Sequence, residues 1–364
     1  MGNIRALVVD DTIVYRKIVG DVLKEIPGVE VVGTANNGKI ALSKIASLKP
    51  DLISLDIEMP EVNGIEVLQA LKDHPKPPVV IMLSTLTQQG SEMTIKALEL
   101  GAFDFVPKPA EGKMAENMQK VKDSFLPIIN AVKRQKNTQF KIREAVHAKP
   151  LTHKNIVHKP SSPTIGKPII RSKSEIIGIG ISTGGPNALT KMIPMLPADL
   201  KAPVLIVQHM PPMFTASLAN SLNNKSNLEV KEAENGDTIE PGKILIAPGG
   251  KQMKIIAAAD GVARKIKITD DPPENSCRPS ADYLFRSIAQ HYVGRSTGVI
   301  MTGMGSDGSK GLVQMKNNGS VVIAQNEETC TVYGMPKEPV ESGIADRVVP
   351  LEKIAEEIVK TIIS

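Results

Sequence analysis

The 364-residue sequence contains no tryptophan, two cysteines and six histidines, and aromatic residues make up only 3% of it. The two cysteines, Cys277 and Cys330, are too few for a disulfide framework or a set of metal ligands, and they are typical of a reducing cytosol. The low aromatic content also argues against a surface that binds nucleic acid.

Long hydrophobic runs are absent as well. No apolar stretch reaches the roughly 20 residues that a membrane-spanning helix needs. The N-terminal stretch MGNIRALVVDD carries two acids where a signal peptide would need apolar residues. A hydrophobic content of 41% is nevertheless sufficient for globular folding, and 364 residues favour two domains. We therefore expect a cytoplasmic, two-domain protein.

Charge is distributed unevenly along the chain. Residues 134–173 contain ten Lys or Arg and one acid, Glu144, whereas the whole chain has a net charge of only +5. The remainder is therefore net negative, which argues against nucleic acid as a partner. Residues 134–173 also carry Pro, Ser and His without apolar periodicity, as a flexible linker does. The sequence thus predicts a domain at 1–133, a basic linker at 134–173 and a second domain at 174–364.

Both predicted domains alternate short β-branched runs with helical periodicity, as doubly wound α/β folds with parallel sheets do. In the first domain we expect strands at 5–10, 29–35, 51–56, 78–84 and 103–108, and a closing helix at 115–135. In the second we expect strands at 175–182, 202–210, 242–250, 253–259, 297–303 and 320–326, some in hairpin-like inserts, and helices at 185–196, 280–292 and 351–363.

Acidic residues follow two strands of the first domain. Asp10 and Asp11 follow one strand and Asp56 follows another, so all three are expected at the carboxyl edge of the sheet. Clustered carboxylates repel one another unless a cation neutralises them, and oxygen ligands suit Mg²⁺. Ser84 and Lys108 end two further strands. Together these groups are suited to phosphoryl transfer onto a carboxylate.

The stretches LVVDD, LDIEMPEVNGIEVL, MLST and ALELGAFDFVPKP resemble a response-regulator receiver domain with a flavodoxin-like fold. The resemblance implies that Asp56 is the phospho-acceptor and that Mg²⁺ is bound by Asp10, Asp11, Asp56 and the backbone carbonyl of Glu58. It further implies that Ser84 binds a phosphoryl oxygen, that Lys108 pairs with the phosphate and that Phe105 reorients.

The run IIGIGISTGGP, residues 176–186, places glycines and a serine directly after a predicted strand. A Walker loop would need a lysine where Pro186 stands, and a dinucleotide fingerprint would need a glycine at Thr183. The pattern Gly180-Ile-Ser182-Thr-Gly184 instead fits a sharp turn that presents a nucleophilic serine.

A serine nucleophile needs a base and an acid that orients the base. Among the six histidines, only His209 ends an apolar parallel strand, and that strand follows the serine strand in sequence. Asp307 lies in a glycine-rich turn after a third strand. Its rival Asp282 opens a helix, where an acid is favoured by the helix dipole alone. We therefore expect a Ser182–His209–Asp307 triad, with the backbone N–H groups of Thr183 and Met304 as oxyanion donors.

The stretches GISTGGP, VQHMPPMFTASLA, RPSADYLFRS, MTGMGSDGSKG and AQNEETCTVYGMP resemble the catalytic domain of the chemotaxis protein-glutamate methylesterases, the CheB family. The resemblance implies a Rossmann-like hydrolytic domain that removes γ-methyl groups from chemoreceptor glutamates and deamidates receptor glutamines, with no cofactor in the hydrolase site. It implies a chemotaxis histidine kinase as phosphodonor, and membrane association only through receptors.

Two other classes of protein fit the sequence less well. A receiver joined to a DNA-binding output is favoured only by the basic linker, since the second domain shows no helix-turn-helix pattern. A metal-dependent hydrolase would need more converging His and Cys than the sequence provides.

Overall fold

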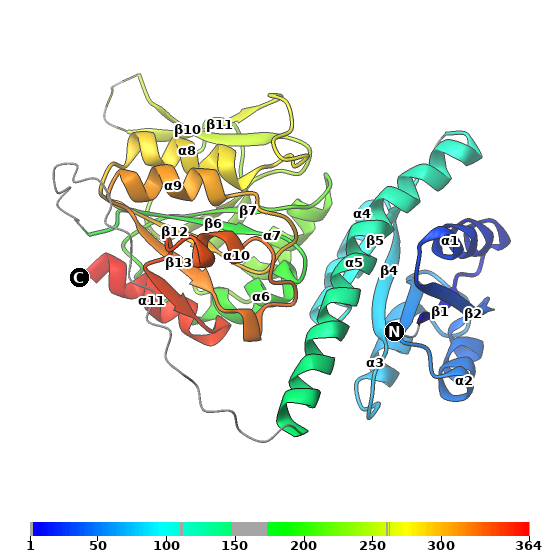
Figure 1. Ribbon diagram of the computed structural model, residues 1–364. Coiled ribbons are helices and arrows are strands. Elements are labelled where there is room, and N and C mark those ends of the chain that lie inside the picture. Colours follow the sequence, from blue (N-terminus) through cyan, green and yellow to red (C-terminus); the bar gives the residue numbers. More distant parts are fainter. Residues whose placement is uncertain (1–2, 110–111, 148–172, 260, 262, 364) are drawn as a thin grey trace.

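A computed structural model describes residues 3–109, 112–147, 173–259, 261 and 263–363 of the chain. Two α/β units follow each other along the sequence, and the first is a five-stranded sheet with the order β2-β1-β3-β4-β5 (Figure 1). Its strand pairs are all parallel, and the five strands lie where the sequence predicts them. The strands are β1 (Ile4–Val9), β2 (Val29–Ala35), β3 (Leu52–Asp56), β4 (Val79–Thr85) and β5 (Asp104–Lys108).

Five helices accompany this first sheet, and apolar positions at helical spacing bury one side of each of the first four. They are α1 (Ile13–Glu25), α2 (Gly38–Leu48), α3 (Gly64–Leu71), α4 (Gln88–Glu99) and α5 (Met114–His147). The chain order reverses between β1 and β3, so the carboxyl ends of these two strands form the crevice in which open α/β sheets bind ligands.

The second unit is built on a seven-stranded parallel sheet with the order β14-β13-β12-β6-β7-β9-β8. The chain order reverses beside β6, which lies between β7 and β12. The strands are β6 (Ile176–Ile181), β7 (Val204–Gln208), β8 (Glu229–Glu232), β9 (Lys243–Ile246), β12 (Ser296–Ile300), β13 (Val321–Gln325) and β14 (Arg347–Val349).

Helices cover both faces of this sheet, as a doubly wound fold requires. They are α6 (Gly185–Met192), α7 (Phe214–Asn223), α8 (Ala281–His291), α9 (Ser309–Asn317), α10 (Lys337–Glu341) and α11 (Leu351–Ile363). An antiparallel hairpin of β10 (Gln252–Ala257) and β11 (Arg264–Thr269) packs on α8. The predicted fold class, two doubly wound α/β units, is thus confirmed.

The closing helix of the first unit is longer than the sequence predicts. Residues 134–147, expected to begin the linker, continue α5 as far as His147. Lys, Arg and Gln, which are frequent here, are good helix formers without any apolar periodicity. The rest of the predicted linker, residues 148–172, lies outside the described residues. No helix in the described part of the chain is both long and apolar enough to span a membrane.

Candidate active site

Ser182 lies on a sharp turn between β6 and α6. Gly184 in this turn has a left-handed φ of 77°, and a Cβ atom there would lie 2.4 Å from the side chain of Thr331. Gly303, in the loop after β12, is equally constrained, since its Cβ would lie 2.7 Å from the Ser182 Cβ. Glycine at both positions lets three segments of backbone close around the serine.

The predicted base and acid are in direct contact. His209 directly follows β7, and Asp307 lies in the loop between β12 and α9. His209 Nε2 lies 2.8 Å from Asp307 Oδ2. Because β7, β6 and β12 are neighbours, the sheet brings His209, Ser182 and Asp307 to one edge, as expected from the sequence.

Asp307 is anchored at the N-terminus of α8. Its Oδ2 accepts a hydrogen bond from the Ala281 N–H at 2.6 Å, and its Oδ1 accepts one from the Ser280 hydroxyl at 2.8 Å. Burial opposes ionisation, but the hydrogen bonds from His209, Ser280 and Ala281 outweigh it and lower the pKa of Asp307 to about 2. The carboxylate therefore stays charged and can orient the imidazole.

Asp282, the rival acid, has another role. It is buried within the first turn of α8, where its Oδ1 accepts the Gly311 N–H at 2.6 Å and its Oδ2 accepts the amide of Asn275 at 2.9 Å. These contacts tie α8 to α9 and to the loop before α8. In the described part of the chain, no hydrogen bond or ion pair joins Asp282 to His209.

The ring of His209 is held on both sides. Its Nδ1 lies 3.7 Å from the sulfur of Cys277, opposite the nitrogen bound by Asp307. Burial disfavours the imidazolium, but the hydrogen bonds to Asp307 and Cys277 outweigh burial and raise the pKa of His209 to about 9. In this arrangement the imidazole is protonated at neutral pH.

The Ser182 hydroxyl is not engaged by the base. Across the residues that the structure describes, Ser182 Oγ makes no hydrogen bond, and neither do the backbone N–H groups of Thr183 and Met304. Ser182 and His209 share a cavity of about 30 Å³, close to the volume of one water molecule. Ser182 is thus partly buried, and neither its hydroxyl nor the two proposed oxyanion donors have hydrogen-bond partners among the described residues.

Side chains of the first unit close this cavity. Leu98, Asp104 and Phe105 line it from α4 and β5. Asp104 Oδ2 accepts the hydroxyl of Thr183 at 2.8 Å. Phe105 stacks on Phe214 of α7 with ring centroids 4.5 Å apart. The first unit therefore covers the proposed nucleophile.

Polar pairs extend this interface along α4. The hydroxyls of Ser91 and Ser217 lie 2.7 Å apart and are buried. Further along α4, Glu99 Oε1 lies 2.5 Å from both the hydroxyl of Ser221 and the ammonium of Lys225.

Asp104, on β5, is also buried at this interface. Burial raises the pKa of Asp104 to about 6, although hydrogen bonds from the Phe105 N–H and the Thr183 hydroxyl lower it.

The clustered acids of the first unit meet at the carboxyl ends of β1 and β3. Asp10, Asp11 and Asp56 bring ligand oxygens within 4.8 Å of one another, and Lys108 Nζ lies 2.8 Å from both Asp10 and Asp56. Burial and repulsion by Asp10 raise the pKa of Asp56 to about 6, although Lys108 lowers it. Three hard oxygen donors, with Glu58 two residues beyond β3, fit a magnesium ion.

The other two predicted residues of this edge, Ser84 and Phe105, interact with partners other than the acids. The Ser84 hydroxyl accepts that of Thr94 at 2.6 Å and lies 3.2 Å from the carbonyl of Gly90. Phe105 is turned toward the second unit, where Phe214 stacks on it. In the part of the chain that is described, no hydrogen bond joins Ser84 to Asp56, although Leu83 beside it pairs with Asp56 across the strands.

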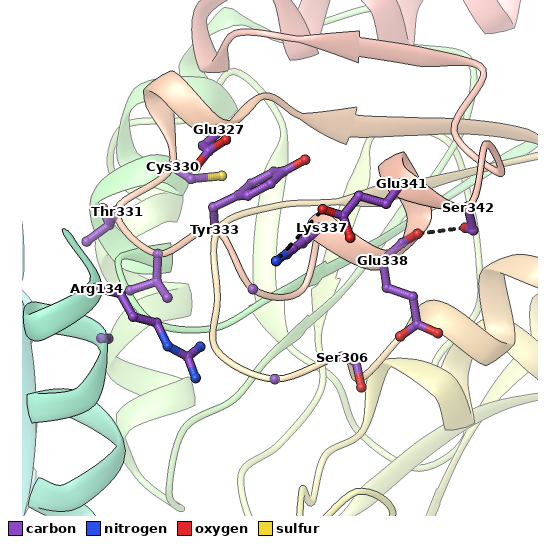
Figure 2. Close-up of a pocket in the computed structure, with 14 residues that line it drawn as sticks. Arg134, Ser306, Glu327, Cys330, Thr331, Tyr333, Lys337, Glu338, Glu341 and Ser342 are labelled. Atoms are coloured by element: carbon purple, nitrogen blue, oxygen red, sulfur yellow. Dashed lines mark hydrogen bonds and ion pairs between the residues drawn. The ribbon is translucent and has the colours of Figure 1, made fainter. Parts of the chain in front are cut away.

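A second cavity, of about 1000 Å³, opens between α5 and the loops after β12 and β13. Figure 2 shows Arg134 facing it from α5, with Glu327, Tyr333 and Glu338 on the opposite wall. Burial and the nearby Glu327 and Glu328 raise the pKa of Cys330, which also lines this cavity, to about 12. The cavity therefore offers room beside the catalytic loops but a poor nucleophile.

Two residues that contact the triad were not anticipated from the sequence. The amide of Asn275 donates to Asp307 Oδ1 at 2.8 Å, and Cys277 contacts His209. Both belong to the turn Glu274–Cys277, which precedes α8. Asn275 precedes the helix N-cap Ser280, and asparagines are common in such loops. This pattern alone cannot predict that Asn275 contacts Asp307, which lies 32 residues further along the chain.

Comparisons with known proteins identify the family of each unit. A family model described as CheB methylesterase matches residues 177–358, and one described as response regulator receiver domain matches residues 6–120. The protein-glutamate methylesterase/protein-glutamine glutaminase of Desulfotalea psychrophila is 58% identical and covers 100% of this chain and 99% of its own length. The Bacillus subtilis protein of the same name is 44% identical, over 98% of this chain and 97% of its own.

Among solved structures, the Thermotoga maritima CheB methylesterase catalytic domain aligns with a TM-score of 0.50 and 42% identity, over 52% of this chain and 99% of that one. The two sequence relatives extend the similarity through both units. The chain therefore belongs to the CheB methylesterase family, with a response-regulator receiver domain preceding the methylesterase domain.

Proposed function

We propose that this enzyme hydrolyses the γ-methyl esters of chemoreceptor glutamates, releases methanol, and is activated by phosphorylation of its receiver domain. Relatives named for both methylesterase and glutaminase activity support deamidation of receptor glutamines as a second reaction. Chemoreceptors are then its substrates and a chemotaxis histidine kinase is its phosphodonor. It acts in the cytoplasm and meets membranes only through receptors. The hydrogen-bonded His209–Asp307 pair beside Ser182 is the observation that carries this proposal.

Each residue of the triad has a role in acyl transfer. Asp307 holds Nε2 of His209, which leaves Nδ1 to take the Ser182 proton. The serine oxygen then attacks the γ-carbonyl carbon, and methanol leaves with that proton. Water, activated by the same nitrogen, releases the glutamate from the acyl-enzyme.

The developing oxyanion needs preorganised donors. The N–H of Thr183 directly follows the nucleophile, and that of Met304 lies in the loop that packs on Ser182 through Gly303. Both are without partners within the described residues. Such donors contribute through preorganisation, since they need not rearrange as charge develops.

Regulation follows from the covered site. A 30 Å³ cavity cannot admit an ester side chain, so Leu98, Asp104 and Phe105 must move away before the substrate binds. In the receiver, Asp56 accepts the phosphoryl group, while Ser84 and Lys108 bind its oxygens and Phe105 reorients. A magnesium ion held by Asp10, Asp11, Asp56 and the Glu58 carbonyl would neutralise the phosphoryl charge.

Substitution of the nucleophile tests the hydrolase assignment. We expect Ser182→Ala to abolish methanol release from methylated receptor, while far-UV circular dichroism stays unchanged. Ser306→Ala, in the neighbouring exposed loop, is the matched control and should retain activity. Methanol release by the Ser182→Ala protein at the wild-type rate would remove Ser182 from the mechanism.

A further inference from the structure

The thiol of Cys277 is held beside the ring nitrogen that Asp307 leaves free. Its sulfur lies 3.7 Å from His209 Nδ1, and the two backbone hydrogen bonds between Glu274 and Cys277, of 3.0 and 2.7 Å, close a two-residue turn. The central residues of this turn, Asn275 and Ser276, have left-handed φ values of 50° and 62°. Such a turn fixes the direction of the flanking residues, so the position of the thiol is built into the loop.

The separation of sulfur and nitrogen matches two ligands on one metal ion. Zinc binds thiolate at about 2.3 Å and imidazole at about 2.0 Å, so a tetrahedral ion separates the two ligand atoms by about 3.5 Å. The observed 3.7 Å requires only a small closure.

The surroundings of the pair are also those of a metal site. Imidazoles that bind metals usually donate their other N–H to a carboxylate, which fixes the ring orientation. Asp307 has this position at 2.8 Å from Nε2. One ligand atom each from Asp307, His209 and Cys277 lies within 4.8 Å of the others.

We propose that Cys277 and His209 form a binding site for a thiophilic divalent cation such as Zn²⁺, with Asp307 as the outer partner of the imidazole. Binding forms bonds from the cation to Cys277 Sγ and His209 Nδ1 and releases two protons to solvent, one from the thiol and one from Nδ1 of the imidazolium. The remaining positions on the ion are filled by water. The bound cation inhibits ester hydrolysis, and the reaction does not require it.

Inhibition, unlike binding, rests on the proposed function. If His209 Nδ1 is the base, a cation on its lone pair prevents it from taking the Ser182 proton. Soft thiolate ligation also separates this site from the receiver acids, whose oxygens prefer Mg²⁺.

Cobalt(II) absorption tests binding without any reference to activity, because a thiolate ligand gives a sulfur-to-cobalt charge-transfer band and carboxylates do not. The intact, untagged chain is titrated with Co²⁺ in excess Mg²⁺, which occupies the receiver acids. We expect the band in the wild type and in Cys330→Ala, and its loss in Cys277→Ala and His209→Ala. A wild type without the band, or a Cys277→Ala protein that keeps it, would overturn the site.

Zinc titration of ester hydrolysis is the second arm, with each variant compared with its own metal-free rate. The wild type and Cys330→Ala should lose at least 90% of their activity at saturating Zn²⁺, and Cys277→Ala should require at least tenfold more Zn²⁺ for the same loss. If the cobalt band forms but zinc leaves the rate of hydrolysis unchanged, the metal site is supported and inhibition by the metal is refuted. The role of His209 Nδ1 as the base is then refuted as well.

Discussion

At the scale of single residues, the charge of His209 determines whether it can act. A base accepts a proton only in its neutral form, and the pKa of His209 in the covered site is raised to about 9. Because the folded-state pKa lies above the ordinary value of 6.5, the neutral form becomes populated only as the pH rises through about 9. A small cavity and a protonated base therefore both lower the basal activity expected at neutral pH.

This charge state leads to a prediction for the pH profile. We expect kcat/KM of the unphosphorylated wild type for a small ester to rise with pH toward about 9. Asp307→Asn removes the carboxylate that stabilises the imidazolium, so the midpoint should move to lower pH while the maximal rate falls roughly a hundredfold or more. An unchanged midpoint in Asp307→Asn would show that the measured ionisation is not that of His209.

Asn275 is expected to position the acid. Its amide bridges Asp307 and Asp282, and hydrogen bonds to charged groups contribute about 1.5–3 kcal/mol. Asn275→Gly keeps the left-handed backbone but removes the amide, so kcat should fall roughly 10- to 100-fold with little change in KM. Ser276→Gly, at the adjacent left-handed position, is the control and should keep the wild-type kcat. Equal rates in the two variants would leave Asn275 without a positioning role.

The convergence of Ser182, His209 and Asp307 could be predicted because each follows a parallel strand, and the carboxyl ends of parallel strands share one edge of the sheet. The contacts of Asn275 and Cys277 could not, since they depend on how one turn folds against a distant loop. The helix N-terminus that argued against Asp282 instead binds Asp307, through Ser280 and Ala281.

At the scale of elements, α4 is the main contact between the two domains. It packs against α6 and α7, and buried apolar residues of both domains form one continuous cluster there. The sequence predicted the strands on either side of α4 but not the contact of α4 with the second domain, because an apolar face that covers its own sheet cannot be distinguished from one that also binds another domain. The helical extension of α5 beyond residue 133 was not predicted, since the sequence there shows no apolar periodicity.

A bulky charge within this interface should open it. Ser91 is fully buried against Ser217, so Ser91→Arg overpacks the contact at a cost of about 1–3 kcal/mol, which corresponds to a roughly 5- to 150-fold shift toward the open form. Basal ester hydrolysis should rise accordingly. Glu92→Arg introduces the same side chain at the next, exposed position and should leave basal activity unchanged. No activation by Ser91→Arg would argue that α4 does not restrain the enzyme.

At the scale of the whole molecule, strand β5 connects the two sites. Its last residue, Lys108, pairs with Asp56, while Asp104 and Phe105 at its start contact Thr183 and Phe214. A phosphoryl group on Asp56 changes the charge beside Lys108. A shift of β5 in response would displace Asp104 and Phe105, which line the cavity at Ser182. Local charge changes of this kind bias two-state interfaces.

The most direct measurement is the rate at which a fluorophosphonate probe labels the intact chain, with the modified residue located by peptide mass spectrometry. We expect labelling at Ser182 alone, faster with Mg²⁺ and a small phosphodonor than without, and unaffected by the phosphodonor in Asp56→Asn. Labelling of another residue would contradict Ser182 as the nucleophile. A wild-type labelling rate that is the same with and without the phosphodonor would contradict its being covered by the receiver domain.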